Sequence, residues 1–164
     1  MLFRSGKKMD YMEKYNKWLK DEYIDQDTKN ELLAIKDNKK EIEERFYKDL
    51  EFGTGGMRGV VGAGSNRMNI YTIGATTQGL ANYIRRQGPE TRAKGVTIAY
   101  DSRNYSYDFA REAALVLNGN GIKTHLFNEI TTTPELSFAV RYLGCAGGIV
   151  VTASHKIGRA SCRE

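Results

Sequence analysis

Apolar side chains return every three or four positions between residues 10 and 50, which is the period of an amphipathic helix. Three stretches follow this pattern, at residues 11–23, 28–35 and 39–50. The second opens with Thr28 as a capping candidate and has Glu31 three residues later, the spacing of a capping box. We therefore expect residues 1–50 to form a charged helical extension that packs one apolar face.

The pattern changes after a glycine-rich segment at residues 52–69. An amphipathic helix is expected at residues 70–86, with Gly88 and Pro89 ending it. Strand-like apolar runs then alternate with helical patterns: strands at 95–100, 122–127 and 147–152, helices at 105–117 and 134–143. This alternation is typical of parallel strands joined by right-handed crossovers. The predicted fold class is α/β, a three-layer domain with a mixed, mainly parallel sheet between helices, preceded by the N-terminal helical extension.

Polar residues follow each of the three predicted strands. They are Asp101, Ser102 and Arg103 after the first strand, the Thr-Thr-Thr-Pro run at 131–134 after the second, and Ser154 with His155 after the third. Parallel strands bring such loops to one edge of the sheet, where α/β proteins bind their ligands. We therefore expect these side chains to form the rim of an active site.

The glycine-rich segment contains the run FGTGGMRG at residues 52–59. Successive glycines let backbone amides approach an anion closely, and the guanidinium of Arg58 suits phosphate oxygens. Phosphate contacts are expected from Thr54, Gly55, Gly56 and Arg58. The run is not a P-loop, because no Gly-Lys-Ser/Thr follows, and no strand–glycine–helix unit makes it a dinucleotide site. The alternative is a turn-rich entry into the sheet with a salt-bridged arginine.

Ser154 follows the last predicted strand, and the residues around it can be compared with two kinds of serine chemistry. The hydrolase motif Gly-x-Ser-x-Gly is absent, because Thr152 and Lys156 stand at the glycine positions. A serine can also carry a phosphoryl group, whose charge of about −1.5 to −2 needs cations, amides or a metal around it. Arg58, Arg103 and a divalent ion would meet that need. The alternative is a polar residue in a turn.

The two histidines receive different interpretations. His155 can orient a phosphate or exchange a proton near neutral pH, and its alternative is an exposed loop residue. His125 lies inside a predicted strand and is expected to be a packed core residue. Asp101 and Arg103 also have a structural alternative, a strand-end ion pair that holds the loop.

Charge and composition narrow the classes of function. The formal net charge is +5, but without residues 1–8 and 156–164 the chain has 19 basic and 19 acidic residues. Nucleic-acid binding needs a basic stripe within the domain and is not favoured. No apolar run approaches the length of a membrane span, and the first residues lack the apolar middle of a secretory signal. The two cysteines lack the spacing of a metal site. We expect a soluble cytoplasmic protein without nucleic-acid or membrane partners.

Four motifs, FGTGGMRG, YDSRNYS, TTPELSFAV and GGIVVTASH, follow one another along the chain. In this order and spacing they resemble the first domain of the α-D-phosphohexomutases, and most of all their bacterial phosphoglucomutase and phosphomannomutase branch. The resemblance covers residues 40–155. It implies an intramolecular phosphotransferase of glucose metabolism that interconverts hexose 1-phosphate and hexose 6-phosphate through a phosphoserine and a bisphosphate intermediate.

The resemblance also implies roles for single residues. Ser154 would be the phosphocarrier and would hold Mg²⁺ through its phosphate. His155 would line the same pocket, Arg58 would contact phosphate near the serine, and Arg103 matches a basic position after the first strand. The bound sugars would be hexose phosphate and hexose 1,6-bisphosphate. Phosphomannose, glucosamine phosphate and phosphopentose stay open as substrates, and a non-catalytic phosphate-binding module stays open as a function.

The chain departs from the family pattern after His155, where the family continues with Asn and Pro. Here Lys156 is followed by IGRASCRE, which we interpret as a translated sequencing adapter. The expected domains are the helical extension at 1–50, a truncated domain I at 51–155 and a non-native tail at 156–164. The sequence leaves open whether residues 1–8 are native, and Met9 is the alternative start. The C-terminal domains of the family would then be missing, and we expect this fragment alone to be inactive.

Overall fold

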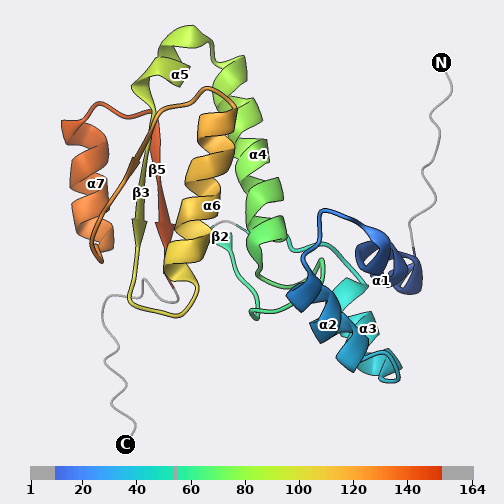
Figure 1. Ribbon diagram of the computed structural model, residues 1–164. Helices are drawn as coiled ribbons and strands as arrows, with labels where there is room; N and C mark the ends of the chain where they lie inside the picture. Colours follow the sequence, from blue (N-terminus) through green and yellow to red (C-terminus); the bar gives the residue numbers. More distant parts are fainter. Residues whose placement is uncertain (1–9, 54, 153–164) are drawn as a thin grey trace, which may run out of the picture. The chain divides into compact units, whose positions relative to one another are not determined.

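The computed structural model describes residues 10–53 and 55–152 of the chain. Its elements in chain order are α1 (Tyr11–Lys20), α2 (Gln26–Ala34), α3 (Lys39–Phe46), β1 (Phe52–Gly53), β2 (Gly56–Met57), α4 (Ile70–Arg86), α5 (Pro89–Lys94), β3 (Val96–Tyr100), α6 (Ser106–Gly119), β4 (Thr124–Leu126), α7 (Thr133–Tyr142) and β5 (Gly147–Val151) (Figure 1). The chain divides between Thr72 and Ile73 into two compact units, which we call the N-terminal and the C-terminal unit.

Aspartate side chains begin the first two helices of the N-terminal unit. Asp10 caps α1 in a capping box with Glu13, whose carboxylate accepts the Asp10 backbone N–H at 3.2 Å. Asp25 caps α2 by accepting the backbone N–H of Thr28 at 2.8 Å. Our prediction that Thr28 begins this helix was wrong, because Asp25 offers a carboxylate three residues earlier. The Thr28 hydroxyl itself donates to that carboxylate at 2.7 Å.

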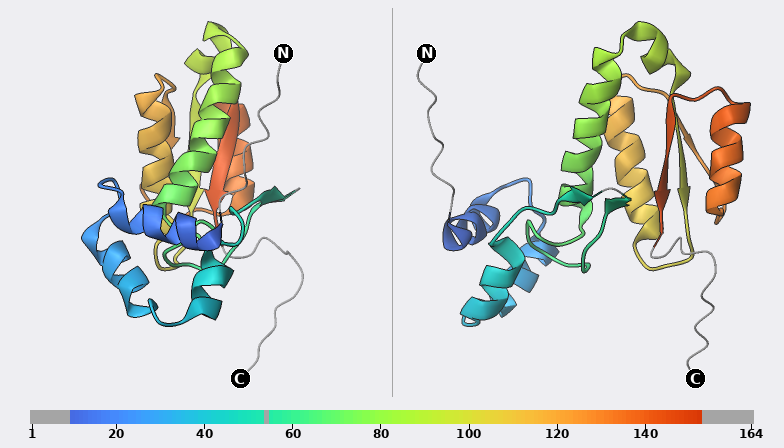
Figure 2. Two further views of the ribbon diagram at one scale, coloured as in Figure 1. Left: turned by 90° about the vertical axis from the view of Figure 1, so that its right-hand side faces the viewer. Right: turned by 180° about the vertical axis from the view of Figure 1, so that it is seen from behind.

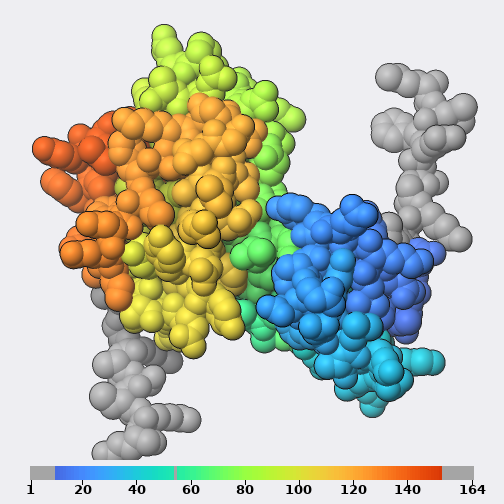
Figure 3. All heavy atoms as spheres, viewed as in Figure 1, coloured from blue at the N-terminus to red at the C-terminus, as the bar shows by residue number. Residues whose placement is uncertain are grey.

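The three helices of the N-terminal unit pack around a small aromatic and aliphatic core. Phe46 is fully buried, and its ring lies edge-on to Tyr15 and Trp18, with centroids 5.8 and 5.6 Å away. The Tyr15 hydroxyl donates to the backbone carbonyl of Leu32 at 3.0 Å, so the one polar atom of this ring is satisfied inside the core. Figure 3 shows α1 to α3, in blue to cyan, packed side by side. The expected helical extension with one packed apolar face is confirmed.

The C-terminal unit contains a three-stranded parallel sheet in the order β4-β3-β5. Val96 pairs with Thr124 on one side and with Gly147 on the other, which fixes the register. Helix α7 covers one face of the sheet, and α4 and α6 cover the other (Figures 1 and 2). The predicted α/β class and its three layers are confirmed. All three described strands of this sheet are parallel, so the antiparallel member of a mixed sheet is not among the described residues.

Strand β3 lies in the middle of the sheet and is buried along its whole length. Val96 and Ile98 have no exposed surface and pack with Leu117 of α6 and Ala81 of α4 in one core. This burial on both faces explains why β3 has a continuous apolar run instead of an alternating pattern. His125 is half-buried instead of packed in the core as predicted, because β4 has a described neighbour on one side only.

Helix α4 spans 17 residues and begins and ends at the predicted positions. Its buried side chains, Thr77, Ala81 and Ile84, recur every three or four positions, so only one face of the helix is apolar. None of the helices that the structure describes is long and apolar enough to cross a membrane. Helix α5 was not predicted, because we took Pro89 only as the end of α4, although proline also suits the first turn of a new helix.

Candidate active site

The glycine-rich segment forms a short antiparallel ribbon in the N-terminal unit. Phe52 pairs with Met57 and Gly53 pairs with Gly56, which leaves Gly55 exposed at the turn. Thr54, the fourth candidate of this segment, lies outside the described residues. The turn therefore offers backbone amides of residues without a side chain, which is the property that close approach to an anion requires.

A hollow of about 640 Å³ lies beside this ribbon, and we call it the glycine-loop hollow. Its lining residues come from α3, from the ribbon and from the segments next to it: Glu44, Tyr47, Lys48, Leu50, Glu51, Gly53, Gly55, Gly56, Arg58, Gly59, Val60 and Asn66. Three of the predicted phosphate contacts, Gly55, Gly56 and Arg58, thus share one hollow. Its charged side chains are two cations, Lys48 and Arg58, and two carboxylates, Glu44 and Glu51.

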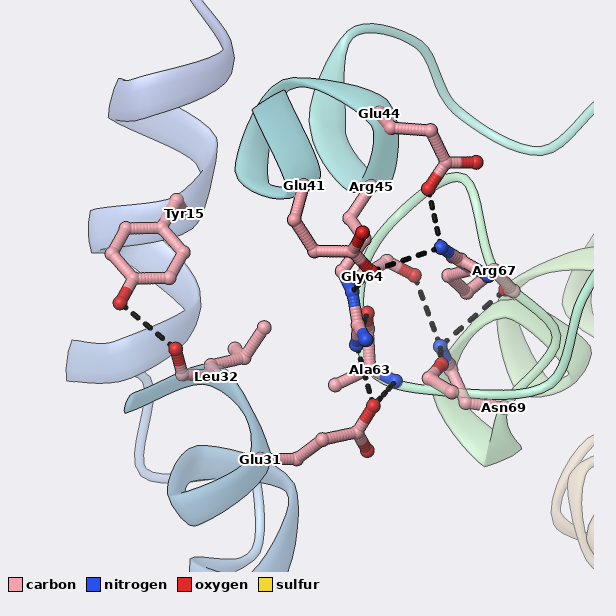
Figure 4. A network of polar contacts seen from close by, with 11 residues as sticks. Tyr15, Glu31, Leu32, Glu41, Glu44, Arg45, Ala63, Gly64, Arg67 and Asn69 are labelled. Carbon is pink, nitrogen blue, oxygen red and sulfur yellow. Dashed lines mark hydrogen bonds and ion pairs between the residues drawn. The ribbon is translucent and has the colours of Figure 1, made fainter. Parts of the chain in front are cut away.

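The segment that follows the ribbon is fixed to α2 and α3 by a polar network (Figure 4). The Glu31 carboxylate accepts hydrogen bonds from the Arg45 guanidinium and from the backbone N–H of Ala63, the latter at 3.1 Å. Arg45 also donates to the Ala63 carbonyl at 3.0 Å and to Glu41 at 2.9 Å. Burial works against the charged form of Arg45, but its bonds with Glu31 and Glu41 outweigh this and raise its pKa. Helices α2 and α3 therefore hold the backbone at Ala63 through a largely buried guanidinium and its more exposed carboxylate partners.

A glycine at position 64 lets the same segment lie directly on α3. Gly64 has φ +131°, and a Cβ atom there would lie 2.8 Å from the carbonyl oxygen of Arg45. The next contact follows at Asn66, whose backbone N–H donates to that carbonyl at 2.9 Å and whose side-chain amide donates to the Glu44 carbonyl at 2.9 Å. Asn66 and Glu44 both line the glycine-loop hollow, so this close contact builds one of its walls.

Arg67 connects the segment to two carboxylates of α3. Its Nη2 atom donates to Glu44 and, at 3.3 Å, to Glu41 (Figure 4). The Arg67 side chain is only 12% exposed, whereas that of Glu44 is 50% exposed. Arg67 Nε is buried and has no hydrogen-bond partner among the described residues. None of these charged partners was a predicted site residue, because they lie far apart along the sequence.

In the C-terminal unit, two of the three predicted loops meet at the carboxyl edge of the sheet. The backbone N–H of Thr131 donates to the carbonyl of Tyr100 at 3.1 Å, and that of Asp101 donates to the carbonyl of Val151 at 3.1 Å. The loops after β3 and β4 and the end of β5 are therefore joined by main-chain bonds. Ser154 and His155, three and four residues past Val151, lie outside the described residues.

Asp101 organises the loop that carries Arg103. Its Oδ1 atom accepts the Ser106 hydroxyl at 2.6 Å and the Arg103 backbone N–H at 3.1 Å. The Arg103 guanidinium is 4.0 Å from the same carboxylate, and its side chain is 65% exposed. A contact at this limit and this exposure contributes little to stability. Asp101 therefore shapes the loop through Ser106 and the backbone more than through this contact with Arg103.

The threonine run after β4 serves the fold. Thr132 begins α7 in a capping box with Glu135, whose carboxylate accepts the Thr132 hydroxyl at 2.7 Å and its backbone N–H at 2.8 Å. These two bonds lower the pKa of Glu135. Thr131 is buried and donates to the Glu129 carbonyl at 2.9 Å. Both hydroxyls thus form local hydrogen bonds that shape the loop and the start of α7, and their contribution to an active-site rim stays a prediction.

A metal site was expected on the phosphate of Ser154. Within residues 10–53 and 55–152, no group of three or more His, Cys, Asp or Glu side chains could hold a metal ion. The described residues therefore do not supply a complete set of protein ligands, and a cation would need the phosphate itself and further groups.

Comparisons with known proteins agree with the motif pattern. Residues 49–160 match the family model described as "Phosphoglucomutase/phosphomannomutase, alpha/beta/alpha domain I". The chain is 40% identical over 129 residues to the phosphopentomutase of Homo sapiens, covering 75% of this chain and 21% of that protein. It is 43% identical over 113 residues to the phosphoglucomutase of Staphylococcus haemolyticus, covering 69% of this chain and 20% of that protein.

A third relative is the probable phosphoribomutase of Schizosaccharomyces pombe, with 38% identity over 144 residues, 85% of this chain and 24% of that protein. The chain therefore spans between a fifth and a quarter of the length of these relatives. No solved structure matches it.

Proposed function

The chain belongs to the phosphoglucomutase/phosphomannomutase family, and from this premise we propose that the complete protein is a phosphosugar mutase of the cytoplasm with Ser154 as its phosphoryl carrier. The observation that carries the proposal is the main-chain bond from Asp101 to Val151, at the carboxyl edge of a parallel sheet. Ligands of α/β sheets bind at this edge, and Ser154 follows Val151 by three residues.

The proposed reaction exchanges one phosphoryl group between serine and sugar. The bond between phosphorus and the Ser154 Oγ breaks while a hydroxyl oxygen of the sugar monophosphate forms a new bond to the same phosphorus. The hydroxyl proton leaves the sugar, and the serine oxygen gains a proton. The product is a sugar bisphosphate. It then reorients within the site, and its other phosphoryl group is transferred to Ser154. Charge stabilisation carries most of the catalysis in such a transfer.

The protein groups around the phosphate would supply that stabilisation. We assign Arg58 and the amides of Gly55 and Gly56, with Thr54, to phosphate binding, and Arg103 and His155 to the same pocket. Support comes from the glycine-loop hollow, which Gly55, Gly56 and Arg58 share. Mg²⁺, if held by the phosphate on Ser154, would neutralise charge on the transferred group.

The proposed substrates are hexose 1-phosphate and hexose 6-phosphate, with hexose 1,6-bisphosphate as the intermediate. A pentose phosphate is the second candidate, because one relative is named a phosphopentomutase and another a probable phosphoribomutase. Glucose 1-phosphate and ribose 1-phosphate, tested on one preparation of the complete protein, distinguish the two. We expect the larger kcat/KM for glucose 1-phosphate.

Substitution of the carrier tests the reaction itself. In the complete protein, Ser154→Ala should lower kcat by at least about a thousandfold, because no other group would receive the phosphoryl group. Ser137→Ala is the matched control, since Ser137 lies exposed on α7 and accepts only a hydrogen bond from Arg141. Bound sugar phosphate without any turnover in the unmodified protein would instead favour a non-catalytic phosphate-binding module.

A further inference from the structure

The wall of the glycine-loop hollow holds as many carboxylates as cations. Glu44 and Glu51 face the same space as Lys48 and Arg58. A phosphate group brings a charge of about −1.5 to −2 at neutral pH, and a carboxylate within several ångströms opposes its binding. Phosphate binding at this place therefore depends on how the two carboxylates are neutralised.

The two carboxylates differ in their partners. Glu44 forms an ion pair with Arg67, whose side chain is largely buried behind the wall. Glu51, by contrast, forms no ion pair with any of the described residues. The Arg67 Nη2 atom donates to Glu44 and, at 3.3 Å, to Glu41, so the guanidinium charge lies directly against the Glu44 carboxylate.

Arg67 itself is held firmly in place. Asn69, two residues further, donates from its side-chain amide to the carbonyls of Gly62 and Gly64 at 2.8 and 3.0 Å, which closes the segment into a compact turn. The Thr72 hydroxyl donates to the Arg67 carbonyl at 2.8 Å. The guanidinium thus approaches Glu44 from a rigid turn and not from a mobile surface chain.

We propose that Arg67 neutralises Glu44 in the wall of the glycine-loop hollow, so that this carboxylate does not compete with a bound phosphate for the cations Lys48 and Arg58. Arg67 is then a positioning residue, which acts on the phosphate through Glu44. The inference rests on the proposed function, because it takes the hollow as the place where the phosphate group of a substrate binds.

The first test compares the two carboxylates and leaves Arg67 in place. The ¹⁵N-labelled chain is titrated with inorganic phosphate at constant ionic strength, and the dissociation constant is read from the amide shifts of Gly55 and Gly56. Glu51→Gln should strengthen binding about threefold, because it removes an exposed negative charge from the hollow. Glu44→Gln should change binding by less than about 1.5-fold, because Arg67 already neutralises that carboxylate.

The second test removes Arg67. Arg67→Met should weaken phosphate binding about fivefold, and adding Glu44→Gln to this variant should restore it, since the exposed carboxylate is then gone. Arg67→Lys, which keeps the positive charge, should bind nearly as well as the original chain. Trp18 fluorescence verifies that each variant is folded. If Arg67→Met does not fold, the role of Arg67 is tested by the phosphate affinities of Glu44→Gln, Glu51→Gln and Arg67→Lys.

The outcomes separate the inference from the function on which it rests. Equal effects of Glu44→Gln and Glu51→Gln, or a loss in Arg67→Met that Glu44→Gln does not restore, would overturn the role of Arg67 while phosphate binding in the hollow stands. Amide shifts of Gly55 and Gly56 that do not respond to phosphate in the original chain would overturn both.

Discussion

The backbone N–H of Asp101 donates a hydrogen bond to the carbonyl oxygen of Val151 at 3.1 Å. This bond extends the pairing of β3 and β5 by one residue. Asp101 begins the loop that carries Arg103, and Val151 is the last residue of β5, three residues before Ser154. The start of one candidate loop is therefore fixed relative to the start of the other by main-chain geometry. Side chains that stabilise this loop should influence the whole carboxyl edge of the sheet.

Ser106 provides the first prediction. Its buried hydroxyl donates to Asp101 at 2.6 Å, and a hydrogen bond to a charged group contributes about 1.5–3 kcal/mol. Ser106→Ala should lower the unfolding free energy of the C-terminal unit by that amount, measured as faster amide hydrogen exchange in β3. Ser102→Ala, at an exposed position of the same loop, should leave the exchange rates unchanged.

Gly95 provides the second prediction. It precedes β3 with φ +74°, and a Cβ atom there would lie 2.6 Å from the carbonyl oxygen of Lys123. With ψ −174°, Gly95 adopts a conformation that is essentially restricted to glycine, so Gly95→Ala should destabilise the C-terminal unit by about 1–3 kcal/mol through backbone strain and by about 1–3 kcal/mol more through the clash. Gly144 also has a positive φ, +63°, but open space around it, so Gly144→Ala meets no clash and should lose less stability. Equal losses in urea denaturation would contradict the close contact at Gly95.

The core of the N-terminal unit can be tested with two adjacent leucines. Leu32 is fully buried, whereas Leu33 is 46% exposed. Leu32→Ala should reduce the unfolding free energy by about 2–5 kcal/mol, and Leu33→Ala by less than about 1 kcal/mol. Trp18 is the only tryptophan of the chain and packs on this core, so its fluorescence follows the unfolding of this unit. A similar loss in both variants would mean that α2 does not bury the face described.

Asp25 makes the stability of the N-terminal unit depend on acid. Partial burial raises the pKa of this carboxyl, but hydrogen bonds from the Tyr71 hydroxyl and from Thr28 outweigh it and lower the pKa to about 2. A carboxyl whose pKa is lowered by folding stabilises the folded state above its unfolded pKa near 4, and this contribution is lost as the pH falls towards 2. The N-terminal unit should therefore lose stability between about pH 4 and pH 2.

Removal of the tyrosine hydroxyl tests the cause of this shift. Tyr71→Phe should raise the pKa of Asp25, measured by NMR titration of its carboxyl, and should weaken the dependence of stability on acid. Tyr83→Phe is the control, because Tyr83 is 61% exposed on α4. A pKa of Asp25 that is the same in both variants would show that Tyr71 does not lower it.

Helices and strands with a clear hydrophobic pattern were predictable from the sequence. The residues at which they begin and end were harder to predict. The amphipathic pattern gave α4 its observed bounds, and the apolar run at 95–100 predicted β3 to within one residue. The start of α2 was missed because Asp25 and Thr28 are both good caps, and only the observed bond selects Asp25. The capping role of Thr132 had a sequence signal, Glu135 three residues later, that we did not use.

The candidate site was predicted only in part. The run of glycines with an arginine left phosphate contact and a turn-rich entry both open, and the structure brings Gly55, Gly56 and Arg58 to one hollow. The carboxylates of that hollow and the partner of one of them could not be predicted, because Glu44 and Arg67 are 23 residues apart and belong to no common period. Long-range ion pairs depend on how the elements pack, which local pattern does not determine.

The central claim is that Ser154 carries a phosphoryl group and passes it to a sugar phosphate. The most direct measurement is the intact mass of the complete protein, with peptide mapping before and after incubation with hexose 1-phosphate. The account predicts one added phosphate group on Ser154, its loss on incubation, and the appearance of hexose bisphosphate in equal amount. A catalytically active protein whose Ser154 is never phosphorylated would contradict the account.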